Sequence, residues 1–270
     1  MIPIPPEDPV LELLHLGYHR QVPHPALEHW VEFYFGVQTT LLRPVVETLY
    51  PDGGSALVFH FAGTDLPGAW FTASQALSRI RFEGRVDGFG VRFLPGGAHA
   101  LLGLAPAKLA DRHYALAELD LPQTDGLFAA LANAGTDGRI RLIEDWLLAH
   151  APGQKTLGPV QKLWRALSRV ETNIDDDLSD AGISRRRFER VFRQQTGMSP
   201  NKFKMLRRIK QARFLIKTQA ELPLTEIAMQ CGYFDQAHFN RHFRSLVGVS
   251  PGSYRNRQLA RIEHAEMKVR

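Results

Sequence analysis

The chain of 270 residues has a single cysteine, Cys231, which excludes an intramolecular disulfide framework and is compatible with a reducing cytosol. Its first residues lack the basic segment and apolar run of a secretory signal. No apolar stretch approaches the ~18 residues that a membrane span needs. The length suits two domains. We therefore expect a two-domain, soluble, cytoplasmic protein that does not contact a membrane.

Acidic residues are scarce in the C-terminal part of the chain. Residues 160–270 carry 22 Lys and Arg against 11 Asp and Glu, a net charge of +11. Residues 1–159 carry 11 against 17, a net charge of −6. A basic segment of this kind is typical of a domain that approaches a phosphate backbone, and the asymmetry favours a nucleic-acid partner.

A pattern of eight residues occurs twice in this basic part, at a constant offset of 51 residues. The first copy consists of Phe188, Arg190, Phe192, Arg193, Gly197, Ser199, Pro200 and Phe203, and the second of Phe239, Arg241, Phe243, Arg244, Gly248, Ser250, Pro251 and Tyr254. Two copies are too few for a solenoid, so the repeat indicates a tandem pair of similar modules.

Each copy reads as the second helix of a helix-turn-helix. The two Phe lie four residues apart on one helical face, and the intervening Arg points elsewhere. Gly197 and Gly248 suit left-handed C-caps, and the following Ser-Pro pairs suit the N-cap and first position of a new helix. A short amphipathic segment and a Gly turn precede each copy. An ordinary repeat of helical hairpins is the alternative, but the basic charge favours helix-turn-helix units.

The segment from Pro200 to about Lys217 is expected to form one helix that joins the two modules. At ~1.5 Å per residue it spans roughly 27 Å. One DNA turn is roughly 34 Å, so the two recognition helices could enter successive major grooves on one face of a duplex.

The first 95 residues read as short strands separated by turn signals. Apolar alternation or apolar runs cover residues 31–37, 56–61, 69–73 and 89–93, which suggests a small antiparallel barrel or sandwich. Helical patterns follow near 101–102, 125–134 and 140–147. We predict an α+β protein with an N-terminal domain (1–150), a Pro- and Gly-containing linker (151–159) and an all-helical domain (160–262).

The second module carries a specific motif set: Ile227-Ala228, Cys231-Gly232-Tyr233-Phe234-Asp235, Phe239, Arg241, Phe243-Arg244, Gly248, Ser250-Pro251 and Tyr254-Arg255. On these residues, the segment from about 160 to 258 resembles the DNA-binding domain of the AraC/XylS family of bacterial transcription regulators. The resemblance implies two helix-turn-helix units, a linking helix and double-stranded DNA as partner. An activator would also contact RNA polymerase.

The resemblance also implies which residues face DNA. The implied base- and backbone-facing positions are Arg185, Arg186, Glu189 and Arg190 in the first module and Gln236, Ala237, His238, Asn240 and Arg241 in the second. Arg can bind guanine, Gln and Asn can bind adenine, and Glu can accept from cytosine. Arg193 and Arg244 are expected to contact phosphate or their own domain. Acidic residues 175–177 either favour a helix N-terminus or weaken DNA binding by the first module.

The segment Gly88–Gly97 gives the N-terminal part a looser resemblance to the cupin-like sensor domains of this family. That resemblance implies a small β-barrel followed by helices, a small-molecule effector and self-association as a homodimer. Phe59, His60 and Trp70 are the candidate effector-pocket residues, and Asp52 could line the pocket with His60. Alternation can place only about half of the eight large aromatics of the predicted strands on an inner face, so the others must meet helices, a partner subunit or a ligand. A domain that serves only self-association or partner contact is the alternative.

Enzymatic functions find little support in the sequence. Several His residues lie in the first 60 positions, but His60 is followed by Phe61 and Ala62 rather than by a cupin metal motif. We expect no catalytic residue, metal or cofactor. Some relatives fuse this DNA-binding module to a cysteine-dependent methyl acceptor. Cys231 instead shares the apolar face of Ile227 and Ala228, where a thiol behaves as a small hydrophobe.

Overall fold

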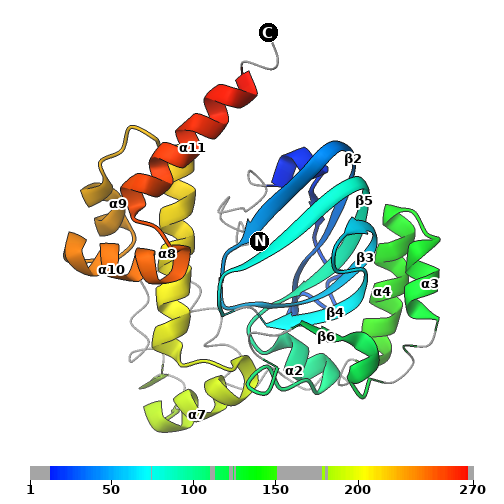
Figure 1. The fold of residues 1–270 in the computed structure, drawn as a ribbon. Coiled ribbons are helices and arrows are strands. Elements are labelled where there is room, and N and C mark those ends of the chain that lie inside the picture. The colour runs from blue at the N-terminus through cyan, green and yellow to red at the C-terminus, as the bar shows by residue number, and fades with distance from the viewer. Residues whose placement is uncertain are drawn as a thin grey trace.

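A computed structural model describes residues 13–73, 75–109, 113–121, 124, 126–150, 178–179 and 182–266. Figure 1 shows an antiparallel sheet with helices α2 to α4 against one side and helices α7 to α11 on the other. The predicted division into an N-terminal α+β part and a C-terminal helical part is confirmed. The predicted linker 151–159, the apolar stripe of the opening helix (160–170) and the acidic residues 175–177 lie outside the described residues.

The N-terminal part contains one six-stranded sheet in the order β1-β2-β5-β3-β4-β6. Its strands, all paired antiparallel, are β1 (His19–Gln21), β2 (Val31–Leu49), β3 (Ser55–Thr64), β4 (Gly68–Ala73), β5 (Ser78–Phe93) and β6 (His113–Ala115). The predicted antiparallel strands are confirmed. However, β1 and β6 form edges of the described sheet, so closure into a barrel is not shown.

The central strands β2 and β5 are much longer than the alternation in the sequence predicts. Their pairing continues across a register shift between Leu41 and Val45. An irregularity of this kind lets a strand bend. Beyond it, the two long strands extend past the core that the shorter strands form. A short 3-10 helix, η1 (Leu14–Leu16), precedes the first strand, and another, η2 (Leu116–Glu118), follows the last one.

One face of the sheet is buried under helices α2 (Gly97–Leu102), α3 (Leu127–Ala132) and α4 (Thr136–His150) (Figure 1). The core there joins alternate strand residues to helix residues, among them Tyr34, Leu57, Phe59, Phe71, Phe89, Leu131, Ile143 and Leu147. Neighbouring residues on the strands point to the opposite face. The aromatics that this core cannot hold, such as Phe33, Phe35 and Trp70, line a cavity on that face.

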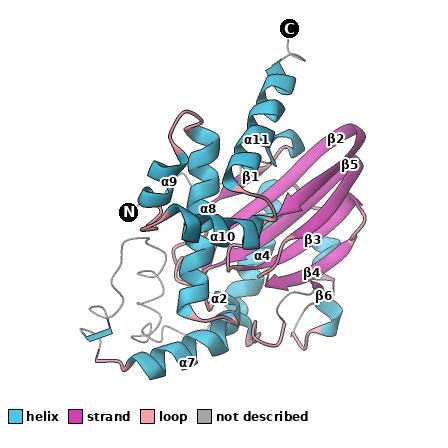
Figure 2. Cartoon of the chain, turned by 60° about the vertical axis from the view of Figure 1, so that its left-hand side comes forward, coloured by secondary structure: helices cyan, strands magenta, loops and turns pink. Residues whose placement is uncertain are grey.

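The helical part is built around α8 (Pro200–Thr218), as predicted for the linking helix. Figure 2 shows α7 (Arg185–Thr196) at one end of α8, with α9 (Leu224–Gln230) and α10 (Gln236–Val247) packed beside its other half. Helix α11 (Pro251–Glu266) follows. The first half of α8 contributes Phe203 and Leu206 to the core of the first module, and the second half contributes Ile209 and Ile216 to that of the second.

The loop between β2 and β3 packs against α8. Tyr50 stacks on Arg213, whose guanidinium carbon lies 3.6 Å from the ring centroid, and Gly53 approaches Phe203 so closely that a Cβ would lie 2.8 Å from Cδ2 of that ring. The φ of Gly53 is 79°, in the left-handed region that favours glycine. The amide of Gln75 donates to the carbonyl of Gly197 at 3.1 Å. The sheet therefore holds both halves of the linking helix.

Candidate nucleic-acid interface and effector cavity

Helices α7 and α10 have the same construction. Ser184 and Asp235 cap them by accepting from the backbone N–H three residues later, at 3.4 and 2.7 Å. Gly197 and Gly248 end them with φ of 78° and 83°, as the repeat predicts. The Phe pairs four residues apart are buried against α8, which turns the remaining faces outward.

The outward face of α7 is strongly basic. The predicted DNA-facing residues of this helix, Arg185, Arg186, Glu189 and Arg190, are all exposed. The Arg185 guanidinium lies 3.2 Å from the Glu189 carboxylate, one helical turn away. Glu189 is the one acidic residue of α7 and pairs with Arg185. The positive charges of Arg186 and Arg190 therefore have no acidic partner on this helix. That is the arrangement a helix needs to meet phosphates and guanine edges.

The outward face of α10 carries polar side chains of several kinds. Gln236, Ala237, Asn240 and Arg241 are exposed. His238 is half-buried because its Nε2 lies 3.0 Å from Nε2 of His242. Burial, together with His238 and Arg241, lowers the pKa of His242. His238 is therefore less available to DNA than its neighbours on this helix.

Arg193 and Arg244 occupy equivalent positions near the ends of α7 and α10, and both are exposed. Their backbone carbonyls accept the C-cap N–H of Gly197 and Gly248, at 2.8 and 2.9 Å. Their side chains lie one turn beyond the predicted base-reading residues. A phosphate contact at this distance along the helix remains our prediction for both.

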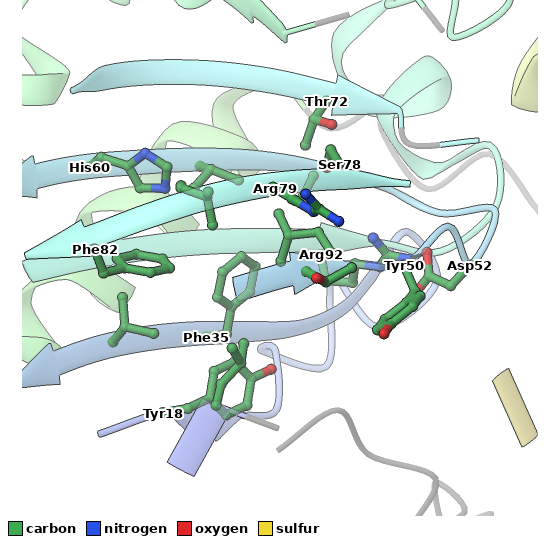
Figure 3. Close-up of a pocket in the computed structure, with 18 of the residues that line it drawn as sticks. Tyr18, Phe35, Tyr50, Asp52, His60, Thr72, Ser78, Arg79, Phe82 and Arg92 are labelled. Atoms are coloured by element: carbon green, nitrogen blue, oxygen red, sulfur yellow. Dashed lines mark hydrogen bonds and ion pairs between the residues drawn. The ribbon is translucent and has the colours of Figure 1, made fainter. Parts of the chain in front are cut away.

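A cavity of about 410 Å³ lies between the second face of the sheet and α8. Figure 3 shows His60 and Phe82 at one end of it and Tyr50, Asp52 and Arg92 at the other. Helix α8 closes the cavity with Lys210, Arg213, Phe214 and Lys217. Because both parts of the chain supply its walls, a molecule bound there would contact the sheet and the helical part together.

An ion-pair network joins the two parts at the Asp52 end. The Asp52 carboxylate pairs with the Arg92 guanidinium and lies 3.5 Å from Nζ of Lys210 on α8. Glu32 lies 3.6 Å from Arg92 on the other side. Burial alone would raise the pKa of Asp52, but Arg92 and Lys210 hold it well below its usual range. Burial lowers the pKa of Lys210, against the opposing effect of Asp52.

Two of the three predicted pocket residues line the cavity, and the third does not. His60 and Trp70 point into it, and Asp52 closes one end. Phe59 is fully buried in the core on the opposite face, because it neighbours His60 on a strand. The sequence reasoning missed Arg79, Lys210 and Lys217. Strand alternation does not mark Arg79, which is exposed beside the cavity-lining Ile80, and the α8 residues are brought in only by tertiary packing.

His60 is fixed by a hydrogen bond within the sheet. Its Nδ1 lies 2.7 Å from the carbonyl of Leu66, which can only accept, so the ring proton sits on Nδ1. Burial lowers the pKa of His60, and the ring is therefore neutral with a lone pair on Nε2. Within the described residues, no group of three or more His, Cys, Asp or Glu is placed to hold a metal ion.

Comparison with known proteins agrees with this geometry. A helix-turn-helix domain family matches residues 178–257, and a family of domains of unknown function matches residues 19–115. The transcriptional activator RhaR of Klebsiella pneumoniae is 40% identical over 79 residues, covering 29% of this chain and 28% of that protein. The arabinose operon regulatory protein of Escherichia coli is 28% identical over 155 residues, covering 51% and 53%. The chain belongs to the AraC/XylS family.

A further relative matches over more of the chain. The transcriptional activator NphR of a Rhodococcus species is 30% identical over 197 residues, covering 69% of this chain and 54% of that protein. The chain thus spans about a quarter to a half of the length of these curated relatives. Cys231 is 0% exposed in the core of the second module, on the apolar face that the sequence predicts for it. None of the helices in the described ranges is long and apolar enough to span a bilayer.

Proposed function

We propose that this protein is a transcription regulator, rather than an enzyme, that binds double-stranded DNA through α7 and α10 of one chain. The observation that carries the proposal is the matched pair of capped helices on one rigid spacer. Helix α8 has 19 residues and is roughly 28 Å long at ~1.5 Å per residue. The two exposed faces then reach successive major grooves, which are roughly 34 Å apart.

The test is selection of binding sites from random duplex DNA by the full chain, followed by fluorescence anisotropy. We expect a selected site with two conserved half-sites about one helical turn apart. Affinity should fall steeply with salt, by about 10³ or more between 50 and 200 mM if six or more phosphates are neutralised. Equal affinity for selected and random duplex would contradict the proposal. As a matched pair, Arg190→Ala and Arg241→Ala should each weaken the sequence preference at one half-site and leave the preference at the other unchanged.

The N-terminal part is proposed to regulate this binding as a cupin-like sensor. The support is the cavity between the sheet and α8, whose size falls in the range of small-molecule sites, ~300–1,000 Å³. Self-association as a homodimer and, for an activator, contact with RNA polymerase belong to the same proposal. Sedimentation of the full chain with and without target DNA measures the first, and transcription from a promoter carrying the selected site measures the second.

A further inference from the structure

Two histidine rings meet on the surface of α10. His238 and His242 are four residues apart, so their side chains lie one above the other on the same side of the helix. Their Nε2 atoms are 3.0 Å apart, and their ring centroids are 4.1 Å apart. Neither residue lines the cavity, and Figure 1 shows α10 on the side of α8 away from the sheet. The pair is therefore a separate, half-buried feature of the helical part.

The spacing of the two nitrogens suits a shared metal ion. Imidazole nitrogens bind a divalent transition metal at ~2.0–2.1 Å, so a separation of 3.0 Å corresponds to an angle of about 94° at the ion. Neighbouring ligands of a square-planar or tetragonal ion, the geometry of Cu²⁺ and Ni²⁺ sites, lie ~90° apart. A tetrahedral ion such as Zn²⁺ would need the two nitrogens roughly 3.3 Å apart or more. Histidines four residues apart are also the pair that helical metal sites use.

Tyr233 holds the two rings in this arrangement. Its ring packs edge-on against both imidazoles. Its hydroxyl oxygen lies 3.3 Å from Nδ1 of His242 and can accept the proton of that nitrogen, which leaves a lone pair on Nε2. A metal-bound histidine commonly donates its second ring nitrogen to an oxygen in this way, and the contact fixes the orientation of the ring. The second ligand shell of a metal site is thus already in place at His242.

The charges around the pair favour one kind of ion. Burial, and then His238, Arg241 and Arg208, lower the pKa of His242, so its ring is neutral at neutral pH. Neutral imidazole is the form that binds a metal. The two arginines, one on α10 and one on α8, repel any cation. An ion can offset that repulsion only by strong bonds to nitrogen, which excludes Mg²⁺ and Ca²⁺, since these ions prefer oxygen ligands.

We propose that His238 and His242 bind one divalent transition-metal ion, Cu²⁺ or Ni²⁺, through their Nε2 atoms, with water in the remaining coordination positions. The ion would lie beside Arg241 on the helix that carries the predicted DNA-facing residues, so it would add positive charge at the edge of that surface. The inference goes beyond the proposed function and does not depend on it, because the two ligands come from one helix and need no DNA.

The test is isothermal titration of NiCl₂ into the full chain at neutral pH, after the chain has been treated with a chelator. We expect a site of one equivalent that His238→Gln and His242→Gln each weaken by tenfold or more, because each removes one of the two protein ligands. MgCl₂ should give no binding. Absence of Ni²⁺ binding, Ni²⁺ binding that neither substitution weakens, or equal binding of Mg²⁺ would overturn the proposal.

A double variant keeps the number of histidines on α10 and changes only their spacing. With Asn240→His and His242→Gln combined, the two histidines are two residues apart and do not face each other. This variant should bind Ni²⁺ as weakly as His242→Gln alone. Binding as tight as that of the unaltered chain would show that the helical spacing is irrelevant and would refute the site. Circular dichroism without metal checks that each variant is folded.

A second measurement needs no variant. Electron paramagnetic resonance of the unaltered chain with one equivalent of Cu²⁺ counts the nitrogen atoms bound to the ion. We expect two imidazole nitrogens, as the 3.0 Å separation requires. A spectrum with one nitrogen ligand or none would contradict the proposal even if every variant failed to fold.

Discussion

Lys210, on the helix that joins the two recognition helices, lies 3.5 Å from the Asp52 carboxylate, which is held in the sheet by Arg92. This single carboxylate is thus the shared partner of a sheet residue and a helix residue. The loop that contains Asp52 also places Tyr50 against Arg213 and Gly53 against Phe203. The relation of the sheet to the DNA-binding part is therefore specified by side chains and is not left to the segment that connects them.

Asp52→Asn should destabilise the protein, because it leaves two largely buried cations without their counter-charge. We expect a loss of about 3 kcal/mol in the free energy of unfolding, measured by urea denaturation. Asp65→Asn, at an exposed position in the same cavity lining, is the control and should stay within about 0.5 kcal/mol. An equally small effect of both substitutions would show that the Asp52 network contributes little to the contact between the two parts.

Phe239→Ala should unfold the second module. The ring is 0% exposed and packs on Phe243 and Tyr233, so its removal should cost about 3–5 kcal/mol. Circular dichroism during thermal unfolding measures the loss. Phe234→Ala changes the same residue type five positions earlier, where the side chain is 105% exposed, and should leave the transition unchanged. A stable Phe239→Ala variant would mean that the register of α10 is wrong.

Arg241→Ala and Arg244→Ala should separate base reading from phosphate contact. Both side chains are exposed on α10, three residues apart. Loss of a bidentate base contact costs about 1–3 kcal/mol at one base pair, whereas loss of a phosphate contact weakens all sequences alike. Repeating the site selection with each variant makes the comparison. An unchanged preference in Arg241→Ala would remove that residue from base readout.

Much of the helical part could be predicted from the sequence, because its signals are local. Ser184, Asp235, Gly197 and Gly248 mark helix ends through contacts within a few residues, and the Phe pairs mark the buried faces. The sheet was predicted less completely. β2 and β5 continue beyond the predicted strands into residues without clear alternation, where pairing with each other, not side-chain pattern, sustains them.

The cavity could be predicted only in part. Strand alternation next to a buried aromatic residue predicts that His60 and Trp70 lie on the cavity face. The same alternation places Phe59 on the opposite face, in the core. The cations that α8 contributes to the cavity come from residues more than 120 positions further along the chain. Lys210 and Lys217 look like solvated charges on a linking helix until the sheet is packed against them, and no local pattern reports that contact.

Stability should fall as the solution becomes more acidic than about pH 6.5. Burial lowers the pKa of His60 below that of an unfolded histidine, ~6.5, so near and below that pH the unfolded chain binds a proton that the folded chain does not. His113 and His242 are shifted in the same direction. Urea denaturation at pH 7.5 and 5.5 measures the difference. His60→Gln should reduce this difference in the free energy of unfolding by up to about 1.4 kcal/mol per pH unit below 6.5. An unchanged difference would contradict the lowered pKa of His60.

Helix α8 is at once a wall of the cavity and the spacer between two DNA-reading surfaces, which makes it a lever. A stiff rod roughly 28 Å long that pivots by about 5° at one end moves its other end by roughly 2.4 Å. That displacement is somewhat smaller than the rise between neighbouring base pairs, about 3.4 Å. Because both recognition helices are packed on this one rod, small adjustments in how the sheet contacts Lys210 and Arg213 would move the two DNA-reading surfaces together relative to the sheet and leave the preferred spacing of the two half-sites unchanged.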